Sequence, residues 1–173
     1  MRARITKITN TQAEPMRRLE ILAQYHEIFN ALNRRYFNNE LPEITIDYRN
    51  DITEDCTAAF TYDTEKATPP KIILQIQEGP EYGINTDTVN DLYHELIHYY
   101  CYLHGIKDTT GANHDYHNYN FKMTAEAHGS YCKWSDLKNG FNQAYLLQQA
   151  AQEILDIPAA ADALYKLYHQ DTQ

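Results

Sequence analysis

The sequence predicts an α+β fold, because helical and strand-like patterns occupy separate blocks of the chain. Apolar residues recur at helical spacing before position 36, alternate with polar residues between 44 and 76, and return to helical spacing after 86. The chain has 173 residues, of which 43% are hydrophobic. This length favours one domain that spans residues 1–173. We expect its core at about 15–130 and a helical C-terminal extension at about 136–170.

The first predicted element is a long amphipathic helix. Pro15 suits the first turn of a helix, where its missing N–H leaves no hydrogen bond unmade. The helix is expected to stop before Asn38, Asn39 and Pro42, which favour turns. Its apolar face consists of Leu22, Tyr25, Phe29, Leu32 and Tyr36.

A small sheet of three strands is predicted next. Three short segments alternate apolar and polar residues, which is typical of half-buried strands. The segment from Asp63 to Lys66 predicts a turn between the second and third strands. The apolar positions are Ile44, Ile46 and Tyr48, then Ala58, Phe60 and Tyr62, and then Ile72, Leu74 and Ile76.

A second long helix follows a loop. Thr86 or Asp87 is expected to cap its start, because both side chains can accept hydrogen bonds from the first backbone N–H groups. Gly105 is the expected stop. The apolar face of this helix consists of Val89, Leu92, Leu96, Tyr99 and Leu103.

The rest of the chain is predicted to be helical. One helix, rich in histidine, is expected from about His114 to His128, with Gly129 as a left-handed cap. Helical patterns continue from Leu137 to Leu155 and from Pro158 to Tyr168. Helices and strands thus remain segregated along the chain.

Composition excludes several classes of protein. No apolar run approaches the roughly 18 residues needed to span a bilayer, and the N-terminal residues lack the apolar segment of a signal peptide. We therefore expect a cytoplasmic protein without a membrane partner. The cysteines form no CxxC pair, which excludes a four-cysteine zinc ribbon and fits a reducing compartment. They are Cys56, Cys101 and Cys132.

The charge distribution bears on nucleic-acid binding. The net charge of −9 opposes unspecific attraction to phosphates. Residues 1–36 contain seven basic and three acidic residues, hence +4, which leaves −13 for the remainder. A solvated helix face is the simpler interpretation, and a weak association of this basic helix with DNA is a further hypothesis. Its arginines are Arg17, Arg18, Arg34 and Arg35.

The chemically informative motif is HELIH at residues 94–98. At this spacing His94 and His98 project from one face of a helix, close enough to bind one zinc ion. Glu95 can reach a water on that zinc. Zinc would lower the pKa of the water, and Glu95 would take its proton and pass it to a leaving amine.

A hydrolytic zinc site needs a third protein ligand. His104 has the spacing of the HExxHxxGxxH motif, but Cys101 replaces the glycine, and a continuing helix would turn His104 about 120° from the pair. His114 and His117 are the best remaining nitrogens, and the residues alone do not decide between them. Carboxylates are also available but are more simply explained as turn, cap or exposed helix residues; these are Asp108, Asp115 and Glu126.

Two segments carry a family resemblance. VNDLYHELIHYYCYLHGIKDTTGANHDYHNYNFKMTAEAHG resembles the SprT-like (Spartan-type) zinc metallopeptidases, in which a histidine four residues before a phenylalanine follows the HExxH helix. That pair here is His117 and Phe121. FNALNRRYFNNELPEITI is similar to the N-terminal helix and first strand of the family. The matching residues there are Asn33, Tyr36, Phe37, Leu41 and Pro42.

The resemblance spans about residues 20–129. It implies a zincin-like α+β fold, one zinc ion held by His94, His98 and His117, and Glu95 as catalytic base. The third ligand would lie on a helix. Asn118 stands where the family often has glycine, and the chain has neither the zinc ribbon nor the basic tail that many relatives append.

Other residues receive simpler interpretations. Glu126 and His128 are expected at a helix end or behind the ligands, and Cys101 as a small buried hydrophobe. A tyrosine could stabilise an oxyanion in the cleft, and the sequence does not select among Tyr99, Tyr116 and Tyr119.

The resulting hypothesis is a zinc-dependent endopeptidase acting on extended polypeptides, with DNA-associated proteins among the candidate substrates. An edge strand beside the HELIH helix would pair with the substrate backbone. The alternative is a catalytically silent zinc-binding module with a protease fold, which serves regulation or interaction.

Overall fold

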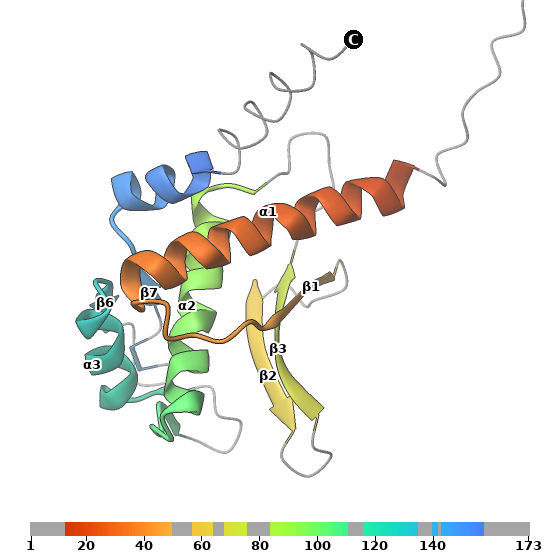
Figure 1. Cartoon of the computed structure of the whole chain (residues 1–173). Helices are drawn as coiled ribbons and strands as arrows, with labels where there is room; N and C mark the ends of the chain where they lie inside the picture. Colours follow the sequence, from red (N-terminus) through yellow and green to blue (C-terminus); the bar gives the residue numbers. More distant parts are fainter. Residues whose placement is uncertain are drawn as a thin grey trace, which may run out of the picture.

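Helix α2 (Thr86–Leu103) lies at the centre of the structure, a computed structural model that describes residues 13–49, 57–63, 68–75, 84–110, 116–134, 140–141 and 143–157. Figure 1 shows a sheet on one side of α2, helix α3 (Tyr119–Ala127) on the other, and helix α1 (Ala13–Tyr36) crossing it. The predicted α+β class is confirmed. No described helix combines the length and apolar character that crossing a membrane requires.

The predicted N-terminal helix is confirmed as α1, which ends where the sequence indicates. Asn38 and Asn39 follow it with φ of 54° and 59°, a left-handed conformation that asparagine tolerates better than most residues. The helix buries a stripe of large side chains against α2 and the sheet. The stripe consists of Tyr25, Ile28, Phe29 and Leu32.

The predicted sheet is confirmed, with the strand order β1-β3-β2. Strand β1 (Thr45–Arg49) runs parallel to β3 (Thr68–Gln75), and β2 (Ala58–Asp63) runs antiparallel to β3. Strand β2 is therefore an edge strand, and it is the strand beside α2 in Figure 1. Ile76, predicted as part of the third strand, lies outside the described residues.

Asn85 caps α2, so the predicted caps Thr86 and Asp87 are wrong by one and two positions. The Asn85 side chain accepts hydrogen bonds from the backbone N–H groups of Asp87 and Thr88, at 2.9 and 3.0 Å. The Thr88 hydroxyl accepts one in return from the Asn85 N–H, at 2.8 Å. This reciprocal capping box satisfies three backbone donors at once. The predicted stop at Gly105 is confirmed, with φ of 64°.

The histidine-rich helix is shorter than expected. Helix α3 begins at Tyr119, because the side chain of Asn118 accepts from the N–H groups of Asn120 and Phe121 and caps the helix there. The predicted start at His114 lies outside the described residues. The predicted end is confirmed, since Gly129 has φ of 88°. Asn118 has φ of −88°, so this position does not require glycine.

In the segment predicted as a helix from Leu137, the described residues before 148, which are 140–141 and 143–147, are not helical. Strand β7 (Gln143–Tyr145) pairs with β6 (Tyr131–Lys133) instead, and residues 148–157 are helical. Ala144, Leu146 and Ile154 are buried in the same hydrophobic core as α1 and α2. Residues 158–168, predicted to be helical, lie outside the described part of the chain.

Asn33 holds the turn after α1 by two hydrogen bonds. It donates to the carbonyl of Leu41 and accepts from the N–H of Leu41, at 2.8 and 3.1 Å, and is 7% exposed. Asn33→Ala is expected to lower the free energy of unfolding by about 2–3 kcal/mol, because both backbone groups would lose their partner. Urea denaturation measures this. The exposed neighbour Asn30→Ala should change stability by under about 0.5 kcal/mol, and an equal loss in both variants would contradict the assignment.

Candidate metal centre

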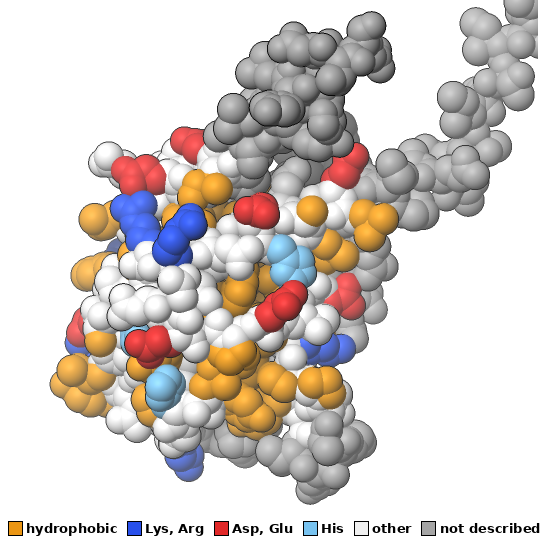
Figure 2. Space-filling model, viewed as in Figure 1, with side chains coloured by type: hydrophobic (Ala, Val, Ile, Leu, Met, Phe, Trp, Pro, Cys, Tyr) orange, Lys and Arg blue, Asp and Glu red, His pale blue; other side chains and the backbone are white. Residues whose placement is uncertain are grey.

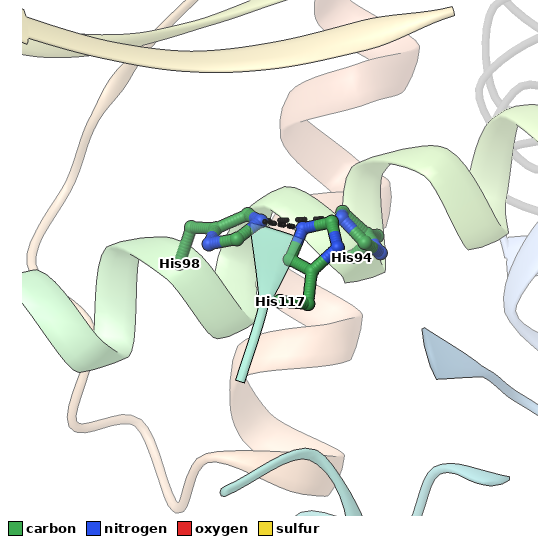
Figure 3. A group of neighbouring side chains, drawn as sticks. All are labelled: His94, His98 and His117. Atoms are coloured by element: carbon green, nitrogen blue, oxygen red, sulfur yellow. Dashed lines mark hydrogen bonds between the residues drawn. The ribbon is translucent and has the colours of Figure 1, made fainter. Parts of the chain in front are cut away.

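Three imidazoles converge on one point beside α2 (Figure 3). His94 and His98 lie one turn apart on α2, and His117 belongs to the short strand β5 (Tyr116–His117). The Nε2 atom of His98 lies 3.2 Å from Nε2 of His94 and 3.0 Å from Nε2 of His117. The structure thus brings together the three histidines that the family resemblance implies. The third lies on a strand just before α3, and the expected position on a helix is wrong.

The spacing of the nitrogens suits a metal ion. A tetrahedral zinc ion with Zn–N bonds of about 2.0–2.1 Å separates its ligand nitrogens by roughly 3.3 Å. The observed separations of 3.0 and 3.2 Å are close to this value. Within the described residues, these three histidines form the group of potential ligands that could hold a metal ion.

The apolar ring of Phe121 packs against all three histidines. Its ring centroid lies 5.0, 4.9 and 4.4 Å from those of His94, His98 and His117, and its side chain is 0% exposed. Burial lowers the pKa of His94 well below its ordinary value, and the adjacent imidazoles of His98 and His117 act in the same direction. His94 therefore stays neutral at pH 7, the form in which imidazole binds metals. The four-residue interval between His117 and Phe121 in the sequence places the Phe121 ring against His117.

Asp108 orients one of the three histidines. Its carboxylate oxygen lies 2.5 Å from Nδ1 of His98. A carboxylate can only accept, so Nδ1 of His98 donates to Asp108, and Nε2, which faces the other two histidines, is the nitrogen left to bind a metal. The sequence interpretation of Asp108 as a simple turn residue missed this role. No spacing rule signals it, because the loop after Gly105 brings Asp108 back to α2.

The loop that carries Asp108 is tied to His117. Strand β4 (Thr109–Thr110) pairs with β5, placing Thr109 opposite His117. The side chains of Asn118 and Asn120 both donate to the carbonyl of Lys107, at 2.9 Å each. These contacts join the loop of Asp108, which orients His98, to the strand that carries His117.

Glu95 lies beside the histidines at the edge of the sheet. It is 5% exposed, and its Oε2 accepts a hydrogen bond of 2.5 Å from the backbone N–H of Phe60 in β2. Burial raises the pKa of Glu95, while His98 and the Phe60 N–H act in the opposite direction. A carboxylate with a raised pKa binds a proton more readily, as a general base must.

The backbone of β2 faces Glu95 for a geometric reason. In an antiparallel pair, alternate residues direct their N–H and C=O groups toward the partner strand. The Gln75 N–H donates to the Thr57 carbonyl at 2.8 Å. The backbone groups of Thr57, and of every second residue after Thr57 in β2, therefore face β3. The backbone groups of Phe60 consequently face away from β3, toward α2 and Glu95.

An aromatic surface adjoins this edge. The Phe60 ring lies 5.7 Å from the rings of both Tyr99 and Tyr102, and the Tyr62 ring lies 4.7 Å from that of Tyr102. Tyr62 and Tyr102 are 51% and 39% exposed. Figure 2 shows hydrophobic side chains gathered over the lower part of α2 and the neighbouring end of the sheet.

Other candidate residues lie elsewhere. His104, rejected as a ligand on helical geometry, stacks on Tyr100 at the end of α2, with centroids 4.1 Å apart. His128 caps α3, with Nδ1 2.7 Å from the Thr124 carbonyl oxygen, which fits the predicted helix-end role.

The exposed Glu126 accepts a hydrogen bond from Lys122 at 2.6 Å, and Cys101 is buried as expected. His114 and Asp115 lie outside the described residues.

The structure does not single out a tyrosine as an oxyanion donor. The Tyr99 hydroxyl donates to the carbonyl of Pro42 at 3.4 Å. Tyr116 makes an edge contact with Trp134, and Tyr119 is 62% exposed beside Lys122. The three candidates from the sequence therefore stay unranked.

The basic N-terminal helix is partly engaged in the fold. Arg35 forms an ion pair with Glu153 at 2.8 Å, and Arg34 is exposed. The side chains of Arg17 and Arg18 are outside the described part of the chain. DNA association stays a prediction.

When the sequence is compared with known protein families and with curated proteins, it matches none. The chemistry assigned to the chain therefore rests on the residues of the site.

Changing Asp108 should weaken metal binding without unfolding the chain. Asp108→Ala removes the group that orients His98, and Asp108→Asn retains an acceptor but loses the charge. We expect zinc affinity to fall by about 10–100-fold in the alanine variant and by less in the asparagine variant. Competition with a chromophoric chelator measures this, with the exposed Asp156→Asn as control. Equal affinity in all four chains would refute the role.

Asp91 is a second partly buried carboxylate on α2, one turn before Glu95. Burial raises the pKa of Asp91 from its ordinary value of 3.8 to about 6. A hydrogen bond from Thr57 opposes the shift, and the charge of Asp87 adds to it. Because the folded chain binds this proton more tightly than the unfolded chain, the contribution of Asp91 to stability falls as the pH rises from about 4 through 6.

Asp91→Asn should therefore stabilise the metal-free chain above pH 6. Relative to the parent, the free energy of unfolding is expected to rise by about 1–2 kcal/mol at pH 8, after allowing for partial solvent screening. This difference should shrink toward pH 4. Urea denaturation of both chains across this range measures it. A difference independent of pH would show that Asp91 does not titrate as inferred.

Proposed function

We propose that the chain is a zinc-dependent endopeptidase of the SprT-like type, with a zincin-like fold. The observation that carries this proposal is the convergence of three imidazole nitrogens beside a buried glutamate on the same helix. His94, His98 and His117 would hold one zinc ion per chain. Three nitrogen ligands leave a fourth position accessible, which distinguishes hydrolytic zinc sites from structural ones.

The donor set favours zinc among the common cations. Calcium and magnesium prefer oxygen ligands, whereas imidazole suits zinc and the later transition metals. Asp108 contributes as a hydrogen-bond acceptor for His98, an arrangement that recurs behind zinc-binding histidines. We therefore assign Asp108 a positioning role, and the histidines the role of ligands.

Zinc, when bound, would lower the pKa of a water molecule and polarise the carbonyl of a peptide bond. Glu95 would take a proton from the attacking water on its carboxylate and deliver it to the nitrogen of the leaving amine. The raised pKa of Glu95 supports both steps, because the carboxylate accepts a proton readily and can hold it until the amine departs. The Phe60 N–H would keep the carboxylate in place.

An extended polypeptide is the substrate that fits the site best. Strand β2 is an edge strand that runs beside Glu95, so a substrate strand could add to this edge next to the Phe60–Glu95 hydrogen bond and bring a carbonyl toward the histidines. The exposed aromatic rings of Tyr62 and Tyr102 would contact apolar side chains of an unfolded substrate. DNA-associated proteins are candidate substrates within this class, and a cytoplasmic location fits the cysteine usage.

Glu95→Gln tests this function. The variant should cleave an unfolded polypeptide such as denatured casein at a rate about 10²–10⁴-fold lower than the parent, because glutamine cannot accept the proton. Its zinc content, measured by elemental analysis, should stay at that of the parent. His117→Ala is the matched control, which should lose both zinc and activity.

The alternative of a catalytically silent zinc module predicts a different pattern. The parent would then contain zinc lost in His117→Ala, yet cleave no member of a peptide library. Equal cleavage by the parent and by Glu95→Gln would overturn the proposed mechanism, and a parent unable to bind zinc would overturn the site.

A further inference from the structure

We infer that Gly140 is a positioning residue for the third metal ligand, and that the described residues 140–141 and 143–146, hereafter segment 140–146, are part of the metal centre. The inference rests on the proposed three-histidine site but not on peptidase activity. Gly140 lies beyond the stretch of sequence that resembles the metallopeptidase family, in a region whose pattern predicts only a helical extension.

The strand that carries His117 is held from both sides. Strand β5 contains two residues, too few to fix its own position by local hydrogen bonds. On one side it pairs with β4, where Thr109 lies opposite His117. On the other side His117 forms a parallel bridge with Gly140, and its carbonyl accepts a hydrogen bond of 3.2 Å from the N–H of Phe141. His117 is thus the central residue of a small three-stranded arrangement.

Only glycine permits this close approach. A Cβ at position 140 would lie 2.3 Å from the His117 carbonyl oxygen, and 3.0 and 3.1 Å from two atoms of the Tyr116 ring. The first contact is with backbone, which cannot swing away as the tip of a flexible side chain does. Gly140 also has φ of 68°, where a side chain is disfavoured. A larger residue must therefore displace either segment 140–146 or His117.

The segment is anchored to the element that carries the other two ligands. The N–H of Leu146 donates to the Asn90 side chain at 2.9 Å, and Asn90 lies on α2 one turn before His94. Ala144 and Leu146 are 2% and 5% exposed, and β7 pairs with β6. Segment 140–146 thus bridges α2 and β5, the two elements whose relative position sets the distance between the ligands. Because the segment is fixed in the core, a methyl group at position 140 would push on His117.

Gly140→Ala is the test, with Gly105→Ala as matched control. Gly105 has nearly the same backbone conformation, φ of 64°, but a Cβ there would meet nothing within 4 Å. Both variants therefore carry a similar backbone penalty, and only Gly140→Ala adds the contact with His117. Zinc affinity is measured by chelator competition, and ligand geometry by the visible absorption of the Co²⁺ form, at a temperature where circular dichroism shows each chain folded.

Gly140→Ala should bind zinc about 10–100-fold more weakly than the parent and alter the Co²⁺ spectrum. Gly105→Ala should keep the parent's spectrum and stay within about threefold of its affinity. Equal affinity and equal spectra in Gly140→Ala and the parent would overturn the inference while leaving the three-histidine site intact. A parent that binds no metal would instead overturn the site itself.

A second variant decides the matter if Gly140→Ala does not fold. Asn90→Ala adds no atoms and releases the link between α2 and segment 140–146. It should lower zinc affinity in the same direction but less than Gly140→Ala. Parent-like affinity in Asn90→Ala, alongside an unfolded Gly140→Ala, would overturn the positioning role.

Discussion

The structure depends on the burial of α2 from several sides. Its apolar side chains pack against α1, the sheet and α3, so any polar side chain on the same helix must find a partner inside the protein. Glu95 has the Phe60 N–H, and His98 has Asp108. The same burial raises the pKa of Glu95 and lowers that of His94, the directions that suit a proton acceptor and a neutral ligand.

The candidate site combines a local part with a part assembled over distance. The helical period alone places His94 and His98 together, so their spacing was readable from the sequence. His117 arrives through a loop that returns to α2, and three separate contacts hold it there: β4, Phe121 and the segment beginning at Gly140. A metal ion held by both parts would connect α2 to β5 directly, and so couple binding to the stability of the fold.

The limits of sequence reasoning follow from the same division. Long elements were predicted correctly, because α1, α2 and the three-stranded sheet display a full hydrophobic period. Strands β5 and β7 have two and three residues, too few to show any period, and β7 was consequently predicted as helix. The start of α3 depends on the capping contacts of Asn118. Asp108 and Gly140 are typical turn residues by type, and only their tertiary contacts give them a role in the site.

A metal ion among the three histidines would need charge balance. Imidazole binds a metal as a neutral ligand, so a divalent cation here would place two positive charges in a half-buried site. Asp108 contacts His98, and Glu95 lies on the same helix as His98. When both carboxylates are ionised, they supply two negative charges close to the histidines. These two carboxylates would offset the charge of the cation without occupying its coordination positions. The carboxylates can therefore orient a ligand and carry a proton, tasks that a directly coordinating carboxylate would perform less well.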